Sequence, residues 1–517
     1  MEFGVENLGF PPKIHLYMIP FTRSLTILFL LSVLIPASAE DAPVEKKPEE
    51  TIPEKIPEPI SKSAKVSIAG TEIPYTVTTG KIQIKDDDGK AKAAIFYISY
   101  VREKTENQPD RAVMFAFNGG PGSSSVWLHL GLLGPKRVSF PGDGTQPFTP
   151  PARLINNESS ILDVCDLVFI DPISTGYSRA VKKEDAKDFH GIDSDIESVG
   201  EFIRKWVSEN KRWDSPKYLC GESYGGIRAA GLAEHLQDRY GMSLNGVVLL
   251  SALLDFRTLI PAQGSQLSYQ IYVPAFSTTA LYHKKITGER DQLLKDVREF
   301  AMGEYTLALL KGNTITEEEL AAVSAKLETF TSLPAEYWKR KHLRVDPAEF
   351  RAELLRDEGK VVGRFDSRVA WSAMDSEASY ATYDPSYSLA IGAFSTAMLS
   401  YLGDDLGWQE ESHYEVLTSK VSPWSYDSDN RVVNFTNRLV DALRDNPKLK
   451  VLVMGAYADL ATPPDGIPYS FSQALDFPAA LRDRVSYSYY DAGHMFYLNP
   501  PDLEKARTDL IDFLNRE

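Results

Sequence analysis

The most informative part of the sequence for the fold is Lys217-Tyr-Leu-Cys-Gly-Glu-Ser-Tyr-Gly-Gly226. It starts as a short apolar run and continues into a helical segment rich in small residues, with Gly221-x-Ser223-x-Gly225 between the two. Small residues on both sides of a serine let the chain turn sharply and leave the serine oxygen exposed at the start of a helix. A plain glycine-rich helix start would not explain the polar Glu222–Ser223 pair at that turn. The stretch therefore predicts a strand, a tight turn with a candidate nucleophile, and a helix.

Short apolar runs of the same kind occur on both sides of this stretch. Each is four to six residues long and is bounded by Gly, Pro or Asp, which is typical of strands buried in a parallel sheet. Helical periodicity separates these runs. The alternation of strand and helix predicts an α/β fold with a central, mostly parallel sheet. The runs cover residues 112–117, 166–170, 217–220, 247–250 and 450–454.

Two segments depart from this alternation. Residues 65–102 alternate apolar and polar side chains between turn signals, which predicts antiparallel strands. Residues 257–430 are mixed and partly helical, and the simplest account is a cap inserted over the carboxyl edge of the sheet. We therefore expect residues 64–256 and 431–517 to form the α/β core and residues 257–430 to form the cap.

The N-terminal segment has the order of a secretory signal peptide. Lys13 and Arg23 precede an apolar run over residues 25–35, which ends in Ala37-Ser38-Ala39. The run is shorter than the ~20 residues that a spanning helix needs, although an uncleaved anchor is the alternative. We expect cleavage after Ala39 and a secreted or periplasmic protein without stable membrane insertion.

The N-terminal segment has two candidate start sites and is followed by a proline-rich stretch. Both Met1 and Met18 are candidate start sites. Residues 40–63 alternate prolines with Glu and Lys and have little to bury, so they are expected to form an extended linker.

Composition excludes several classes of protein. The chain has 517 residues, of which 43% are hydrophobic and 25% charged, which is ordinary globular usage. A net charge of -16 repels phosphate backbones and anionic membranes, so we expect no nucleic-acid partner. Two cysteines exclude a disulfide scaffold, and without a His-Glu-x-x-His motif or a cysteine pair at ligand spacing we expect no metal or other cofactor. The oligomeric state stays open.

A serine nucleophile needs a base and a group that orients the base, and in this kind of fold they follow in the order Ser, Asp or Glu, His. Of the eight histidines, only His494 follows a strand-like run, residues 485–490, near the C-terminus. Asp459 follows the last buried run. Asp491 is a rival orienter, but it lies only three residues before His494. The expected triad is Ser223, Asp459 and His494.

Four blocks of sequence carry a resemblance. They are Asn118-Gly-Gly-Pro-Gly-Ser-Ser-Ser125, Asp166-Leu-Val-Phe-Ile-Asp-Pro-Ile-Ser-Thr-Gly-Tyr-Ser178, Gly221-Glu-Ser-Tyr-Gly-Gly226, and Gly493-His-Met495 with Asp459 before it. In this order they resemble the serine carboxypeptidase family of α/β-hydrolases over nearly the whole mature chain. The resemblance implies Ser223 as nucleophile, His494 as base and then acid, and Asp459 as orienter.

The same resemblance implies two further roles. The backbone amides of Gly120 and Tyr224 would form the oxyanion hole, which stabilises the tetrahedral intermediate. Asn118 and Glu222 would bind the C-terminal carboxylate of a peptide substrate. Two carboxyl groups can share a hydrogen bond only if one carries a proton, so binding should favour acidic pH.

The sequence also departs from the family. Many members have Trp where this chain has Ala116, and a second glutamate where it has Leu132. Where family members usually have a cysteine after Pro-Gly, this chain has Ser123, so it resembles the disulfide-poor bacterial members. The departures keep a serine esterase or acyltransferase with the same triad as the alternative, whereas the intact triad argues against a non-catalytic binder. The side-chain preference around the scissile bond is not predicted.

Overall fold

The computed structural model describes residues 56–103, 111–262, 264–428 and 432–516. The predicted signal peptide, residues 1–39, and most of the predicted linker lie outside the described residues, and they stay predictions. None of the helices in the described ranges combines the length and the hydropathy that a membrane span requires.

A mixed sheet forms the centre of the fold. Within the described residues it has ten strands, in the order β1-β2-β3-β7-β4-β9-β10-β13-β14, with β8 (Arg179–Ala180) paired to β3. The first three strands are antiparallel: β1 (Ile60–Ile68), β2 (Thr71–Lys85) and β3 (Ala91–Arg102). The six strands that follow β3 in this order are parallel to one another: β7 (Cys165–Ile170), β4 (Ala112–Phe117), β9 (Lys217–Glu222), β10 (Gly246–Leu250), β13 (Lys450–Ala456) and β14 (Val485–Tyr490). The expected α/β class and the expected buried runs are confirmed.

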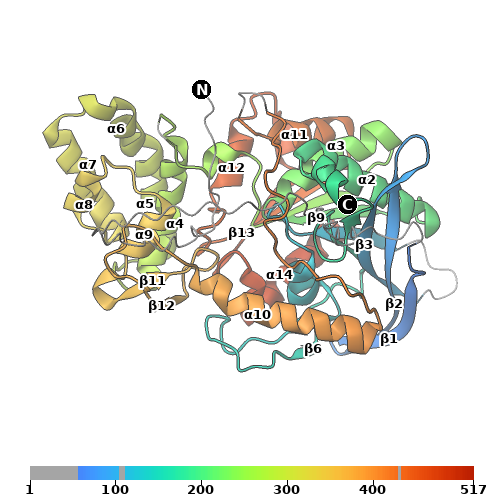
Figure 1. The fold of residues 1–517 in the computed structure, drawn as a ribbon. Coiled ribbons are helices and arrows are strands. Elements are labelled where there is room, and N and C mark those ends of the chain that lie inside the picture. The colour runs from blue at the N-terminus through green and yellow to red at the C-terminus, as the bar shows by residue number, and fades with distance from the viewer. Residues whose placement is uncertain (1–55, 104–110, 263, 429–431, 517) are drawn as a thin grey trace, which may run out of the picture. The chain divides into compact units, whose positions relative to one another are not determined.

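Helices cover both faces of this sheet (Figure 1). Along β4 the side chains alternate, so that Phe115 packs into one hydrophobic cluster and Met114 into the other. The cluster around Phe115 contains residues of α2 (Ile192–Glu209), α3 (Gly225–Tyr240) and α11 (Thr436–Asp445). The cluster around Met114 contains residues of α14 (Pro500–Asn515), α1 (Val126–Leu128) and the turn that follows it, η1 (His129–Leu133).

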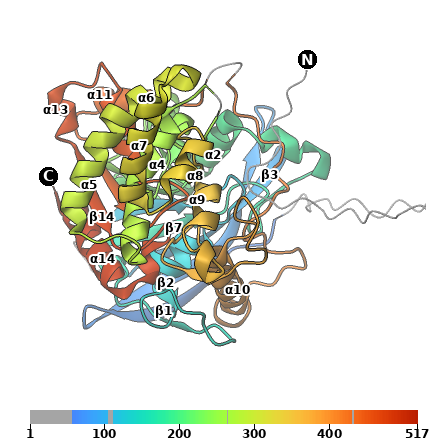
Figure 2. The same cartoon turned by 90° about the vertical axis from the view of Figure 1, so that its left-hand side faces the viewer.

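A separate group of helices lies beside the sheet, at the left of Figure 1 and stacked in Figure 2. They share a third hydrophobic cluster, in which Phe276 stacks on Phe350 at 4.0 Å. The group consists of α4 (Leu267–Tyr282), α5 (Arg290–Phe300), α6 (Thr306–Lys311), α7 (Glu317–Thr331), α8 (Ala335–Arg340) and α9 (Pro347–Glu353).

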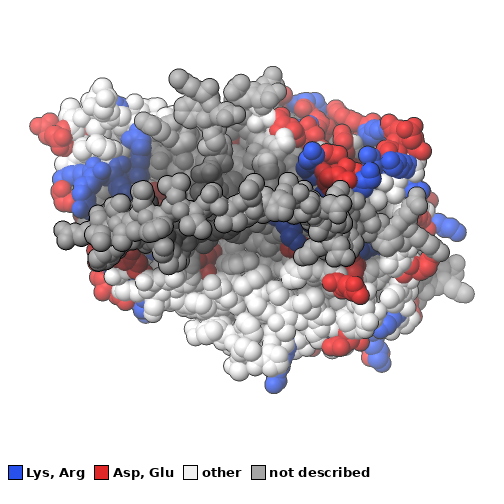
Figure 3. Space-filling model, in the orientation of Figure 1, with Lys and Arg blue, Asp and Glu red and all other residues white. Residues whose placement is uncertain are grey.

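The later part of the predicted cap packs differently. The helix α10 (Pro385–Ser400) contributes Phe394 and Met398 to the cluster around Met114, and the Phe394 ring lies 4.8 Å from that of Trp127. This helix carries no charged residue, and the surface over it is mostly uncharged, whereas acidic and basic side chains alternate over α2, α3 and α11 (Figure 3). The cap boundary at residue 430 stays a prediction.

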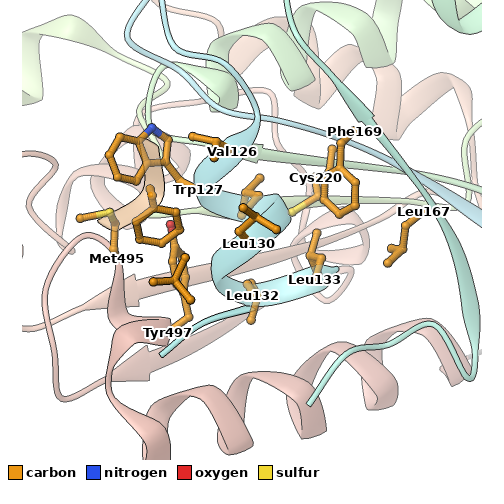
Figure 4. Close-up of a cluster of buried hydrophobic side chains, with 14 of the residues drawn as sticks. Val126, Trp127, Leu130, Leu132, Leu133, Leu167, Phe169, Cys220, Met495 and Tyr497 are labelled. Atoms are coloured by element: carbon orange, nitrogen blue, oxygen red, sulfur yellow. The ribbon is translucent and has the colours of Figure 1, made fainter. Parts of the chain in front are cut away.

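Both cysteines, Cys165 and Cys220, are buried and free. Burial raises the pKa of both thiols. Cys220 packs near Leu130 and Phe169 in the apolar cluster of Figure 4. It therefore occupies the place of a small apolar residue.

Candidate active site

Ser223 lies in a tight turn between β9 and α3. Its backbone has a φ of 63°, in the left-handed region that side chains other than glycine rarely adopt. A Cβ atom on Gly221 would lie 2.1 Å from the Gly225 carbonyl oxygen, and one on Gly226 would lie 2.6 Å from Cβ of Ala252. Only glycine fits at these two positions, so the strand, turn and helix that Gly-x-Ser-x-Gly predicts are present.

His494 and Asp459 lie together at the same edge of the sheet. Asp459 follows β13 and His494 follows β14, and these two strands are parallel neighbours. His494 Nδ1 and Asp459 Oδ2 are 2.8 Å apart, and both residues are buried. Burial alone lowers the pKa of His494, but the Asp459 carboxylate and its hydrogen bond outweigh this, so the pKa lies above its ordinary value.

The rival orienter, Asp491, does not contact the histidine. Its carboxylate is exposed and pairs with Arg290 of α5. The Asp491 carboxylate therefore belongs to a surface ion pair, and the hydrogen-bond partner of the His494 ring is Asp459.

Thr462 is a residue of this site that the sequence analysis missed. Its hydroxyl lies 2.8 Å from Asp459 Oδ2, 3.0 Å from His494 Nδ1 and 2.7 Å from the carbonyl oxygen of Ser251. The backbone N–H groups of Ala461 and Thr462 donate to Asp459 Oδ1 at 2.7 and 2.9 Å. These bonds hold both oxygens of the carboxylate. The signal was its position three residues after an Asp, since Asp side chains often accept bonds from backbone just ahead of them.

The loop after β4 packs directly on the serine turn. A Cβ atom on Gly119 would lie 2.4 Å from the backbone nitrogen of Tyr224 and 2.8 Å from the carbonyl oxygen of Glu222. Gly120 has a φ of 109°, which only glycine adopts readily. The loops that carry Gly120 and Tyr224, the two predicted oxyanion residues, are therefore in contact.

Glu222 and Asn118 lie beside this contact. The Glu222 carboxyl is buried and hydrogen-bonds to the Asn118 side chain. Asn118 Oδ1 also accepts a bond from the backbone N–H of Leu128 at 3.2 Å, which fixes the orientation of the amide. Burial raises the pKa of Glu222 to about 7, although His494 and the hydrogen bonds work against this. A carboxyl group with this pKa is protonated in acid and can then donate a hydrogen bond.

Tyr497 is the second residue that the sequence analysis missed. Its hydroxyl donates to Glu222 Oε2 at 3.0 Å and lies 3.3 Å from Oε1. Its ring packs so closely on the turn after α1 that a Cβ atom on Gly131 would lie 2.3 Å from it. Leu132, the position where many family members have a second glutamate, follows Gly131 and belongs to the same buried cluster as Tyr497 (Figure 4). No pattern in the sequence points to a tyrosine hydroxyl across this distance along the chain.

One segment of the predicted cap touches both loops of the His–Asp pair. The backbone N–H of His494 donates to the Phe365 carbonyl at 2.5 Å, and that of Ser367 donates to the Ala458 carbonyl at 2.9 Å. The Phe365 ring lies 5.1 Å from the His494 ring. The backbone between residues 365 and 367 thus holds the ends of two strands together.

A mostly parallel sheet with a serine turn after one strand and a His–Asp pair after two others defines the class of α/β-hydrolases. The comparisons with known proteins are specific within this class. The model of the family described as serine carboxypeptidase matches residues 70–444. The protein therefore belongs to the serine carboxypeptidase family.

Curated relatives match over shorter stretches. The pheromone-processing carboxypeptidase KEX1 of Saccharomyces cerevisiae is 31% identical over 149 residues, which are 27% of this chain and 19% of the relative. Serine carboxypeptidase-like 34 of Arabidopsis thaliana is 28% identical over 189 residues, 35% of each chain. The chain thus matches about a fifth to a third of the length of these relatives.

A solved structure supports the fold over a longer stretch. The crystal structure of KEX1(delta)p, a prohormone-processing carboxypeptidase from Saccharomyces cerevisiae, has a TM-score of 0.52. The match covers 85% of this chain and 90% of that one, with 15% sequence identity. At this identity the similarity supports the α/β-hydrolase fold alone.

Proposed function

We propose that the protein is a serine carboxypeptidase, which hydrolyses the C-terminal peptide bond of peptides through an acyl-enzyme on Ser223. The observation that carries the proposal is the 2.8 Å bond between His494 and Asp459 in a chain whose serine lies in a tight turn at the same sheet edge. Membership of the serine carboxypeptidase family supports it.

In the proposed mechanism His494 takes the proton of the Ser223 hydroxyl as its oxygen attacks the scissile carbonyl carbon. The oxyanion that forms is stabilised by the backbone N–H groups of Gly120 and Tyr224. His494 then gives the proton to the leaving amine, and the C-N bond breaks. Water repeats these steps on the ester and releases the shortened peptide, while Asp459 keeps the imidazole oriented throughout.

The proposed carboxylate site consists of Asn118 and Glu222. Because the pKa of Glu222 is raised to about 7, the group is neutral at acidic pH and donates a hydrogen bond to the substrate carboxylate. Above that pH it is ionised and repels the same carboxylate. We expect kcat/KM for peptides with a free C-terminus to fall as pH rises through neutrality.

The second candidate is a serine esterase or acyltransferase with the same triad. The observation in its favour is that Leu132, at the position of the family's second glutamate, is buried among apolar side chains (Figure 4). The carboxylate site then has one acid instead of two. An ester substrate does not need such a site.

The experiment that tests both candidates compares two N-blocked dipeptides, one with a free C-terminus and one amidated, between about pH 4 and pH 8. Cleavage of the free acid alone, fastest in acid and abolished in Ser223→Ala, is the expected result. Equal cleavage of both peptides, or turnover of a simple ester alone, would favour the second candidate. Activity that persists in Ser223→Ala would contradict both.

We also infer that the mature protein is secreted or periplasmic after cleavage behind Ala39. The charged, apolar and small-residue order of residues 13–39 supports this inference. N-terminal sequencing of the exported protein tests it: a mature chain that starts at Glu40 is expected, and an intact leader would contradict it.

A further inference from the structure

Arg228 is a buried charged residue for which the proposed mechanism has no role. It lies on α3, five residues after Ser223, and only 1% of it is exposed. Its Nε donates to Asp195 Oδ2 of α2 at 2.8 Å, and an Nη nitrogen donates to the backbone carbonyl of Asn118 at 2.6 Å. Its guanidinium carbon lies 5.4 Å from the centre of the Tyr224 ring.

These contacts reach both loops of the proposed oxyanion hole. The Asn118 carbonyl belongs to the peptide that joins Asn118 to Gly119, so a bond to it fixes the start of the loop that carries Gly120. The Tyr224 ring belongs to the residue whose N–H is the other proposed donor, and a guanidinium within about 6 Å of an aromatic ring is attracted to its face. One planar group therefore contacts both donor segments.

Within the described part of the chain, one buried carboxylate, that of Asp195, balances the charge of Arg228. Asp195 is 3% exposed, and the ion pair joins two helices that cover the same face of the sheet. A buried charge without a partner is strongly destabilising, so Asp195 is needed for Arg228 to stay at this position. Helix packing alone does not require the bond from Arg228 to the Asn118 carbonyl, because this carbonyl belongs to neither helix.

We infer that Arg228, held by Asp195, is a positioning residue for the oxyanion hole: it sets the distance between the loop of Gly120 and the turn of Tyr224. This inference rests on the proposed function. An oxyanion hole binds the transition state better than the substrate, so its misplacement lowers kcat and leaves KM nearly unchanged. Lysine cannot replace the arginine, because one ammonium cannot make the divergent bonds to Asp195 and Asn118.

The test uses Arg228→Lys with Arg212→Lys as its matched control. Arg212 is also a buried arginine in an ion pair, at 2.8 Å from Asp166, and it also donates to a backbone carbonyl, that of Arg111. Asp166 lies at the start of β7, at the sheet edge opposite the candidate site. Both variants lose the same chemical group, and thermal unfolding reports whether both remain folded.

The expected result is a fall in kcat of about 10- to 100-fold in Arg228→Lys, with KM within about twofold, and kcat within about twofold in Arg212→Lys. Affinity for a peptide boronic acid, whose tetrahedral adduct on Ser223 places an oxygen in the oxyanion hole, should fall in parallel, while product affinity stays. A folded Arg228→Lys with unchanged kcat, or with the same loss as the control, would overturn the inference.

Two arrangements keep this test decisive. If Arg228→Lys does not fold, Asp195→Asn replaces it, since the amide oxygen still accepts the bond from Arg228 but the charge is lost. A drop in kcat at constant KM is then expected, because Arg228 loses the charge that holds it in place, and none at all would refute the inference. The wild type and Ser223→Ala distinguish a failure of this inference from a failure of the proposed function. An inactive wild type, or an active Ser223→Ala, counts against the proposed function.

Discussion

Glu222 is the residue whose protonation the proposed function depends on most closely. Burial raises its pKa, whereas the bonds from Tyr497 and Asn118 and the charge of His494 lower it. The balance puts the pKa at about 7, so both the neutral and the ionised carboxyl group are populated near neutral pH. Tyr497, a neutral donor, packs on Gly131, next in sequence to Leu132, where many family members have a second acid.

Tyr497→Phe should move the pH profile of kcat/KM. Removal of the hydroxyl takes away a donor that stabilises ionised Glu222, so the pKa of Glu222 rises further and the decline with pH shifts upward by about one pH unit. The phenyl ring keeps its packing on Gly131. The measurement is kcat/KM for a blocked dipeptide with a free C-terminus across the pH range.

Tyr490→Phe is the matched control, since Tyr490 is also buried and its hydroxyl donates to a carboxylate, Asp509, at 2.6 Å. The control should keep the wild-type profile. A downward shift in Tyr497→Phe, or equal shifts in both variants, would show that Tyr497 does not act on Glu222.

The loop after β4 and the turn after β9 are built as a single unit. Gly119 lies in backbone contact with Tyr224 and Glu222, and Arg228 bridges the same two segments from the helix that follows. Such contacts leave no space for a side chain, which explains the run of glycines in both motifs. The elements therefore position the proposed oxyanion donors through their backbones.

Gly119→Ala should separate these two elements. The added Cβ would lie 2.4 Å from a backbone nitrogen, which cannot move aside as a flexible side chain can. A displacement near 1 Å at a catalytic group can lower the rate by about 100-fold, so kcat/KM should fall by that order. Gly303→Ala is the control, since nothing lies within 4 Å of a Cβ atom there. Unchanged kcat/KM in a folded Gly119→Ala would refute the role of this contact.

Three hydrophobic clusters organise the described residues: one on each face of the sheet and one within the helices α4 to α9. Helix α5 joins the third cluster to the core through two arginines. Arg290 pairs with Asp491 and stacks on Tyr457 at 4.4 Å, and Arg298 pairs with Asp465 at 2.8 Å. Helix α4 also contacts the segment that bonds to the loops of the His–Asp pair, because Thr279 Oγ1 lies 2.7 Å from Ser367 Oγ. The docking of these helices therefore bears on the geometry of the site.

Arg298→Met should destabilise the protein as a whole. Asp465 Oδ2 already has no hydrogen-bond partner among the described residues, and loss of Arg298 would leave the half-buried carboxyl unpaired. We expect a loss of about 1–3 kcal/mol in the free energy of unfolding, measured by denaturant titration. Arg444→Met, which breaks an exposed pair with Asp441, should leave the free energy of unfolding nearly unchanged. Equal losses would mean that the α5 contact is an ordinary surface pair.

Much of the fold was predictable because it depends on local pattern. A strand buried on both faces must be a short apolar run, and residues 112–117 coincide with β4 for that reason. A serine flanked by glycines requires a strand, a turn and a helix, and these are β9, Ser223 and α3. The cap was predicted only as a break in the alternation of strands and helices. Its helices α4 to α9 bury their apolar residues mainly against one another and not against the sheet.

The class of fold, the serine turn and, through chain order, the pairing of Asp459 with His494 could be predicted from the sequence alone. These depend on the period of apolar residues and on the sequence of strand ends, which are properties of the chain. By contrast, the contacts of Thr462 with Asp459, of Tyr497 with Glu222 and of Arg228 with Asn118 are apparent only in the folded protein. Their side chains reach partners on other segments across the packed core, and the direction of a side chain between distant segments follows from packing, which no local period encodes.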